Sequence, residues 1–252
     1  MNKVNPPSRV ALLVTCLVDV FRPQIGVASV TLLERAGCSV SVPIQTCCGQ
    51  PNYNAGDRES AKQSAKKIIQ TFETFDYVVV PSGSCAGMIG KHYPSLFSEE
   101  TAWENRAEQL AKKTYELTSF LTDVLGVKTV TAEYPHRVTY HDSCSSLREL
   151  GIQQQPRLLL NSVRGLSLCE LQQREACCGF GGTFCVKYPA ISDKIVSDKV
   201  RDVLSTAAGT VVAGDLGCLM NIAGKLQREG HAIQVFHVAE VLANLTDKGM
   251  GA

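Results

Sequence analysis

Short apolar runs alternate along the chain with longer segments in which apolar residues recur every three or four positions. Apolar runs of this length predict buried β-strands, and the helical periodicity predicts amphipathic helices between them. The predicted strands cover residues 10–15, 39–42, 78–80, 138–141, 166–171 and 211–213. The predicted helices include Leu32 and Leu33, and residues 57–72, 104–113, 117–125, 158–160, 191–204 and 238–245. Strands that alternate with helices indicate an α/β fold with mainly parallel sheets flanked by helices.

The same order of strands, helices and cysteines occurs twice, which indicates an internal duplication. Eight of the eleven cysteines follow the same order in the two halves: one cysteine, then a Cys-Cys-Gly triplet, then one more cysteine. The cysteines are separated by 31 and 38 positions in the first half, and by 33 and 41 positions in the second. We therefore predict two similar tandem domains, residues 1–130 and residues 131–252, each with its own small sheet.

The balance of charged residues excludes several classes of partner. The 25 Lys and Arg nearly match the 24 Asp and Glu, so the formal charge is +1 and a nucleic-acid partner is not expected. The apolar runs are far shorter than the ~18 residues of a membrane span. Residues 1–9 contain no small-residue cleavage site of a secretory signal. We expect a cytoplasmic chain without an integral membrane segment.

The cysteines carry the strongest indication of chemistry. The chain has 11 of them, an odd number that excludes complete disulfide pairing and, in a reducing compartment, favours metal binding or thiol chemistry. In a parallel α/β sheet, residues that follow the carboxyl ends of the strands converge at one edge, where ligands bind. Eight repeated cysteines lie at such positions: Cys16, Cys47, Cys48 and Cys85 in the first half, and Cys144, Cys177, Cys178 and Cys218 in the second.

Four thiolates at one site suit either zinc or an iron–sulfur cluster. The adjacent cysteines favour the cluster, because neighbouring side chains tend to diverge and both sulfurs are then difficult to place on one metal ion. Glycines beside each pair, such as Gly49 and Gly179, would let backbone amides approach the sulfurs. We predict up to two clusters, with zinc as the alternative occupant.

The remaining candidates carry weaker signals. Cys38 and Cys169 lie within predicted apolar strands, and we interpret them as buried packing residues. Cys185 follows a glycine-rich turn in the second half alone, so it is a possible additional site residue. His141 precedes Asp142 at a strand end, where we favour a structural, hydrogen-bonded histidine over a proton carrier.

Two further observations complete the set of candidates. His237 begins the last predicted helix, and we interpret it as a helix cap or a packing residue. No motif for binding NAD, flavin or ATP is present, because the glycines after Cys178 do not have the spacing of a dinucleotide loop.

The sequence around these cysteines resembles the cysteine-rich (CCG) domain family. That family includes the cysteine-rich subunit of heterodisulfide reductase and the carboxy-terminal part of the glycolate oxidase iron–sulfur subunit. The likeness extends in particular to the lactate-utilisation protein A family and covers nearly the whole chain. It is carried by the phrases at residues 46–51, 82–85, 176–184 and 214–222.

This resemblance implies an iron–sulfur electron-transfer subunit in a cytoplasmic complex that oxidises L-lactate to pyruvate. The other subunits would be a ferredoxin-like iron–sulfur protein and a third component, and the chain would not bind lactate alone. The wider family ends each motif with Cys-x-x-Cys, but here Ser82 and Asp215 stand where the first of those cysteines would be. An ordinary [4Fe-4S] cluster on four cysteines is then favoured over a split cluster. Asp215 could supply an additional oxygen ligand or cap the following helix.

Two other classes of function remain open from the sequence. The first is a thiol or disulfide oxidoreductase of the heterodisulfide reductase type, which would act through its clusters or through Cys185. The second is an interaction module that zinc stabilises and that has no redox role.

Overall fold

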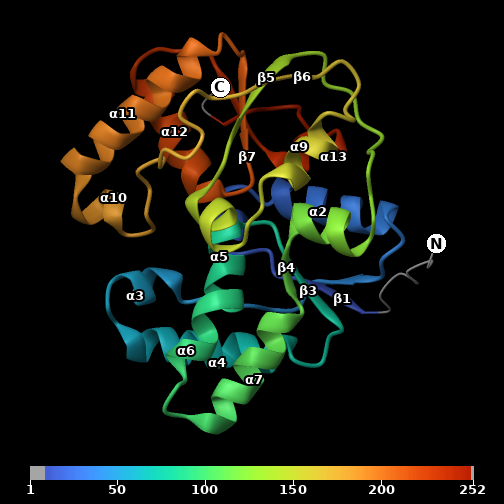
Figure 1. The fold of residues 1–252 in the computed structure, drawn as a ribbon, viewed down its shortest axis with the longest axis vertical. Helices are drawn as coiled ribbons and strands as arrows, with labels where there is room; N and C mark the ends of the chain where they lie inside the picture. Colours follow the sequence, from blue (N-terminus) through green and yellow to red (C-terminus); the bar gives the residue numbers. More distant parts are fainter. Residues whose placement is uncertain (1–8, 251–252) are drawn as a thin grey trace. The chain divides into compact units, whose positions relative to one another are not determined.

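The computed structural model describes residues 9–250, so the predicted absence of a signal in residues 1–8 lies outside the described residues. The chain forms two compact units that divide between Val127 and Lys128. Each unit contains a four-stranded sheet in which all strands are parallel, with helices on the connections (Figure 1). The prediction of an α/β fold with two similar halves is confirmed.

The first unit has the strand order β2-β1-β3-β4. Its strands are β1 (Val10–Leu12), β2 (Val40–Ser41), β3 (Tyr77–Val80) and β4 (Thr114–Glu116). Its helices are α1 (Cys16–Phe21), α2 (Gln24–Arg35), α3 (Gln50–Asn54), α4 (Arg58–Phe72), α5 (Gly83–Gly87), α6 (Tyr93–Leu96), α7 (Thr101–Lys112) and α8 (Leu117–Ser119), with π-helical turns η1 (Met88–His92) and η2 (Phe120–Val124).

The second unit repeats this plan with the strand order β6-β5-β7-β8. Its strands are β5 (Arg137–His141), β6 (Ser167–Cys169), β7 (Thr210–Ala213) and β8 (Gln234–His237). Its helices are α9 (Gln154–Leu160), α10 (Phe184–Lys187), α11 (Pro189–Ser205), α12 (Leu216–Arg228) and α13 (Val238–Ala243), with the π-helical turn η3 (Ser145–Glu149).

The central strands are buried because both of their faces are covered. All three residues of β1 and all four of β7 are buried, and such strands read as continuous apolar runs. Helix α4 shows how the surrounding helices pack: its buried residues recur every three or four positions, and its outer face is polar. Asp57 caps this helix by accepting a hydrogen bond from the amide of Ser60 at 3.1 Å.

The register of the two sheets assigns equivalent positions in the two units. Val10 pairs with Tyr77 in the first sheet, and Val138 pairs with Thr210 in the second. Counting along β1 and β5 from these pairs makes Leu13 equivalent to His141. The two units therefore correspond residue by residue along these strands.

The fourth strand of each sheet, β4 and β8, was not predicted. Strand β4 has three residues, of which only Glu116 is buried, so it lacks an apolar run. Strand β8 contains two buried apolar residues, Val235 and Phe236, between polar ends. The sequence pattern of these segments does not predict a strand. They adopt the strand conformation because β4 pairs with β3 and β8 pairs with β7.

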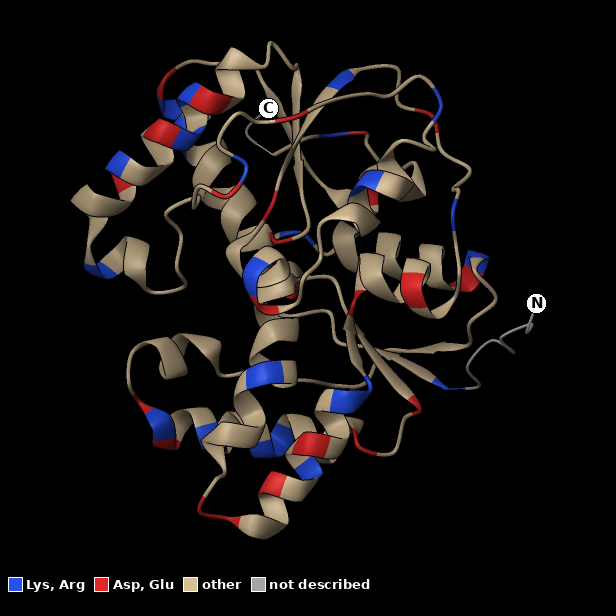
Figure 2. Cartoon of the chain, in the orientation of Figure 1, with Lys and Arg blue, Asp and Glu red and all other residues tan. Residues whose placement is uncertain are grey.

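Charged residues of both signs are mixed along the helices, as α7 and α11 show (Figure 2). No helix among residues 9–250 combines the length and the apolar composition that a membrane crossing needs.

Candidate metal centres

The four repeated cysteines of the first unit all follow carboxyl ends of its strands. Cys16 begins α1, the first helix after β1. Cys47 and Cys48 lie in the turn between β2 and α3, and Cys85 lies in α5 after β3. Parallel strands bring these segments to one edge of the sheet, as the sequence predicted.

The sulfurs of the first unit form a row in which neighbours are in contact. The thiol of Cys16 hydrogen-bonds to Cys47, and Cys47 in turn contacts Cys48. At the other end of the row, the Sγ atoms of Cys48 and Cys85 are 3.3 Å apart. The backbone amide of Gly49 donates to the Sγ of Cys47 at 3.5 Å.

The second unit contains the same row, built from the equivalent elements. The thiols of Cys144 and Cys178 both hydrogen-bond to Cys177, and Cys178 also contacts Cys218. The backbone amide of Gly179 donates to the Sγ of Cys177 at 3.3 Å. Both units therefore bring together all four of their predicted sulfurs.

The cysteines within each row differ in burial and in the direction in which their surroundings shift the pKa of the thiol. Cys48 and Cys178 are each 2% exposed. Hydrogen bonds from the neighbouring thiols lower the pKa of Cys47 and the pKa of Cys177 below the usual value of a thiol. The thiolate is the form of cysteine that binds metals.

A glycine in a left-handed conformation turns the chain after each cysteine pair. Gly49 and Gly179 both have φ of 82°. A Cβ at Gly49 would lie 3.0 Å from the Cβ of Ser64, and one at Gly179 would lie 2.8 Å from the carbonyl oxygen of Ser192. Both the conformation and the space require glycine, which explains the Cys-Cys-Gly triplet.

The carbonyl of the second cysteine in each pair is held by a side chain from another element. The hydroxyl of Tyr93 donates to the carbonyl of Cys48 at 2.7 Å. The amide nitrogen of Asn221 donates to the carbonyl of Cys178 at 2.8 Å. The two units thus fix the same backbone group with different residues, and neither residue was identified from the sequence.

The residue after each triplet contacts the segment that carries the last cysteine. In the first unit, the side-chain amide of Gln50 donates to the carbonyl of Ser84 at 3.2 Å. In the second unit, the ring of Phe180 lies 2.4 Å from where a Cβ on Gly217 would stand. Glycine at position 217 therefore makes room for this ring beside Cys218.

The spread of the sulfurs tests which metal group each row fits. A single zinc ion holds its thiolates at about 2.3 Å, so any two of them lie within about 4.6 Å of each other. Among residues 9–250, the group of three donor atoms that all lie within 4.8 Å of one another consists of His141, Cys178 and Cys218. The four cysteines of either unit do not form such a group. A longer row suits a cluster, in which several iron atoms share the thiolates.

Ser82 and Asp215, which replace a family cysteine, both cap the helix that carries the last cysteine. The hydroxyl of Ser82 accepts a hydrogen bond from the amide of Cys85 at 3.4 Å. A carboxylate oxygen of Asp215 accepts one from the amide of Gly217 at 3.2 Å. The capping interpretation of Asp215 is confirmed, while its role as a ligand stays a prediction.

The other cysteines lie apart from the sulfur contacts described above. Cys38 is 7% exposed and follows α2, and burial raises its pKa. Cys169 ends β6 and is half-buried. The Sγ of Cys185 lies 3.6 Å from the carbonyl of Gly182. Cys185 is not among the hydrogen-bond partners of the four sulfurs of its unit.

The two histidines singled out from the sequence have different surroundings. His237 caps α13: its Nδ1 accepts from the amide of Ala239 at 3.1 Å, and Glu240 accepts from the backbone of His237 at 2.8 Å. The interpretation of His237 as a cap is confirmed. His141 is fully buried, and neither of its ring nitrogens has a hydrogen-bond partner among residues 9–250. The interpretation of His141 as a hydrogen-bonded structural residue is wrong.

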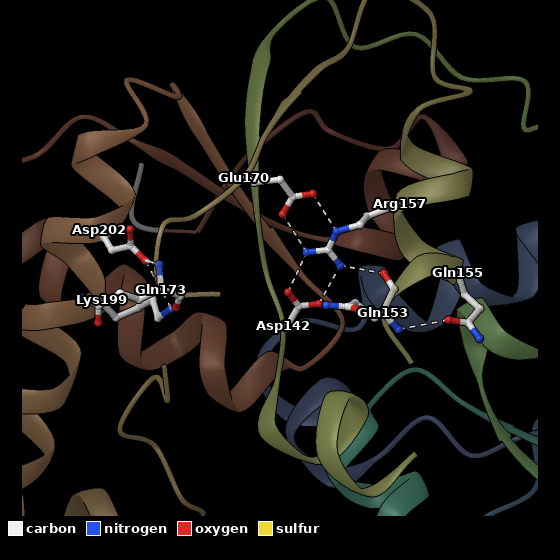
Figure 3. Close-up of polar contacts among 8 residues, drawn as sticks. All are labelled: Asp142, Gln153, Gln155, Arg157, Glu170, Gln173, Lys199 and Asp202. Carbon is white, nitrogen blue, oxygen red and sulfur yellow. Dashed lines mark hydrogen bonds and ion pairs between the residues drawn. The ribbon is translucent and has the colours of Figure 1, made fainter. Parts of the chain in front are cut away.

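A buried ion-pair network beside the second row was also missed. Arg157 forms two hydrogen bonds to Asp142, at 2.8 and 2.7 Å, and two to Glu170, at 2.7 and 2.9 Å (Figure 3). Asp142 is 2% exposed and Arg157 is 6% exposed. The sequence analysis noted Asp142 beside His141. It did not predict the ion pair between Asp142 and Arg157, because the two residues are 15 positions apart.

Comparisons with known proteins agree with the duplicated sulfur rows. A model of the cysteine-rich CCG domain family matches residues 10–90 and 138–223. Curated proteins named lactate utilization protein A are similar over nearly the whole chain. The protein from Oceanobacillus iheyensis is 47% identical over 243 residues, which are 96% of this chain and 99% of that protein. The protein from Shouchella clausii is 50% identical over 234 residues, with 92% and 98% covered.

Among solved structures, a hypothetical protein from Helicobacter pylori is similar with a TM-score of 0.65 and 11% sequence identity. The match covers 98% of this chain and 51% of that one, so the chain spans about half the length of that protein. At this level of identity, the likeness supports the fold alone.

Proposed function

Because the chain belongs to the CCG cysteine-rich domain family and to the lactate utilization protein A group within it, we propose that it is an iron–sulfur electron-transfer subunit. It acts in a cytoplasmic complex that oxidises L-lactate to pyruvate. The two rows of four sulfurs carry this proposal, since each row is more extended than a single zinc ion requires. A reducing cytoplasm keeps such thiols free to bind iron.

A bound [4Fe-4S] cluster would supply one-electron steps at each row. The oxidation of lactate to pyruvate releases two electrons and two protons, so two one-electron centres match it in number. The chain's own residues hold the sulfurs in place and shield them from water, with Cys48 and Cys178 the most enclosed. The amides of Gly49 and Gly179 donate to sulfur, which favours the more negative, reduced state.

The substrate step belongs to another component in this proposal. The chain receives electrons and passes them on, and its partners are a ferredoxin-like iron–sulfur protein and a third subunit. Lactate oxidation then requires the assembled complex, and the isolated chain is expected to be inactive with lactate.

Composition and spectroscopy of the anaerobically purified chain test the proposal. We expect brown protein with equal amounts of iron and acid-labile sulfide, about four of each for every filled site. Reduction with dithionite should produce electron paramagnetic resonance (EPR) signals of reduced clusters. Cys38→Ala provides the matched control, because it removes a cysteine outside the rows and should retain the full iron content. Colourless protein that contains zinc and no sulfide would contradict the proposal.

A further inference from the structure

His141 has a buried polar side chain for which the described residues provide no hydrogen-bond partner. It ends β5, it is 0% exposed, and both ring nitrogens lack hydrogen-bond partners among residues 9–250. Leaving a buried polar group without a partner destabilises the folded state. Such a group requires an explanation, and an absent ion is one of the standard ones.

The position of the imidazole indicates what that partner is. A ring nitrogen of His141 and the Sγ atoms of Cys178 and Cys218 all lie within 4.8 Å of one another. These two cysteines form one end of the second sulfur row. The imidazole is thus placed against the row, where two sulfurs and one nitrogen lie together.

A histidine binds a metal ion as the neutral imidazole. A neutral imidazole has one nitrogen with a free lone pair and one N–H group. The lone pair can bind a metal ion, which would provide a partner for one of the two ring nitrogens.

We propose that His141 is a nitrogen ligand of the metal centre in the second unit, which then offers four sulfurs and one nitrogen. The proposal rests on the metal centre of the proposed function, but the ligand role holds for any metal that binds thiolates. Imidazole and thiolate together suit zinc, cobalt and iron.

The first unit provides an internal control for this assignment. Leu13 occupies the position equivalent to His141 and is also 0% exposed. An apolar side chain is therefore compatible with the fold at this place, and His141→Leu should fold. The first centre is predicted to have four sulfur ligands and no nitrogen.

Cobalt(II) bound to the reduced, metal-free full chain is a suitable probe. A background with Cys47→Ser and Cys48→Ser removes the first site, so that only the second site responds. In this background we expect a paramagnetically shifted imidazole signal in the proton NMR spectrum of the cobalt protein. Changing His141→Leu should abolish that signal and weaken cobalt binding at least about tenfold. Circular dichroism of the metal-free variants verifies that they remain folded.

The outcomes separate this inference from the proposed function. Unchanged cobalt affinity in His141→Leu, with no shifted imidazole signal before the change, would overturn the ligand role even if iron and sulfide are present. Loss of the signal with His141→Leu in a protein that never assembles iron and sulfide would support the ligand role and refute the electron-transfer proposal.

Discussion

The two units hold the same sulfur row in different surroundings. Beside the first row, the residues after β1 are Leu13 and Val14, and Val14 packs 3.2 Å from where a Cβ on Gly26 would stand. At the equivalent positions of the second unit are His141 and Asp142, both buried. The two units share the sulfurs and the glycine turns, while the second row has charged and polar buried residues beside it where the first has apolar ones.

Helices α4 and α11, which pack against the glycines of the two triplets, also differ: a buried position that is apolar in α4 is charged in α11. A Cβ at Gly49 would meet Ala61 and Ser64, and one at Gly179 would meet Ser192 and Ile195, so equivalent positions of the two helices differ by 131. This offset pairs Lys199 with Ile68, which is an apolar core residue.

The side chain of Lys199 is fully buried in the second unit. Its Nζ donates to the carbonyl of Gln173 at 2.9 Å and lies 3.8 Å from Asp202 (Figure 3). A positive charge beside a cluster favours its reduced state. We therefore expect the second centre to have the higher reduction potential and to accept electrons from the first.

The largest effect on stability is expected at the ion-pair network, which belongs to the second unit. Arg157→Met leaves the buried carboxylate of Asp142 without its partner and should destabilise this unit by about 3–5 kcal/mol. Native-state hydrogen exchange measures this unit separately. Arg106→Met is the matched control in the first unit, because its ion pair with Glu73 is partly exposed and should contribute about 1 kcal/mol or less. Equal costs in the two variants would contradict the account.

The first unit has its own buried charge, which should make its stability depend on pH. Burial raises the pKa of Glu116 from 4.5 to about 7, while the hydroxyl and amide of Thr118 donate to its carboxylate. The folded state therefore binds the proton more tightly than the unfolded state. The contribution of Glu116 to stability should be largest below pH 4.5 and fall by about 3 kcal/mol as the pH rises to 7.

Glu116→Gln tests this pH dependence. Glutamine can still accept the capping hydrogen bonds but does not titrate, so the slope between pH 4.5 and 7 should disappear. Urea unfolding followed by exchange protection in the first unit measures it. An unchanged slope in the variant would show that another group is responsible.

The glycine turns should tolerate substitution differently. Gly179→Ala meets a backbone oxygen at 2.8 Å, whereas Gly49→Ala meets a side-chain carbon at 3.0 Å, and both residues have a positive φ. We expect Gly179→Ala to cost about 2 kcal/mol and to lower the metal content of the second centre, with about 1 kcal/mol for Gly49→Ala. Metal analysis and thermal unfolding of both variants measure the difference. A larger loss from Gly49→Ala would be the opposite of this expectation.

The effect expected from the buried lysine is on the reduction potential of the second centre. Lys199→Ile places the residue of the first unit in the second and should lower the reduction potential of the second centre by on the order of 60 mV. Asp202 retains its hydrogen bonds from the amides of Gln172 and Gln173, so the helix should stay in place. A potentiometric titration measures the shift. An unchanged potential would remove Lys199 from the explanation of the difference between the units.

Segments whose own sequence shows a clear apolar pattern could be predicted. Segments whose conformation depends on pairing with a neighbouring strand could not. Strands β3 and β7 were predicted because buried parallel strands are apolar throughout, as the run Val78 to Val80 shows. Strand β4 was missed because Thr114 and Tyr115 are only half-buried, and the segment forms a strand through pairing with β3. The apolar pattern along the sequence therefore predicted the central strands of the sheets and missed an edge strand.

The same distinction applies to the candidate site. The repeated spacing of the cysteines shows which sulfurs come together, since the ends of parallel strands must meet. His141 stands out because neither of its buried ring nitrogens has a hydrogen-bond partner among the described residues. Only the packing of the folded unit reveals this. The sequence favoured a hydrogen-bonded structural histidine, because most buried polar side chains have hydrogen-bond partners.

The central claim is that each unit holds its own centre, and a redox titration monitored by EPR tests it most directly. We predict two separable one-electron transitions in the native chain. Cys48→Ser should retain only the transition of the second unit, and Cys178→Ser only that of the first. Loss of both transitions in either single variant would show one shared centre and contradict the account.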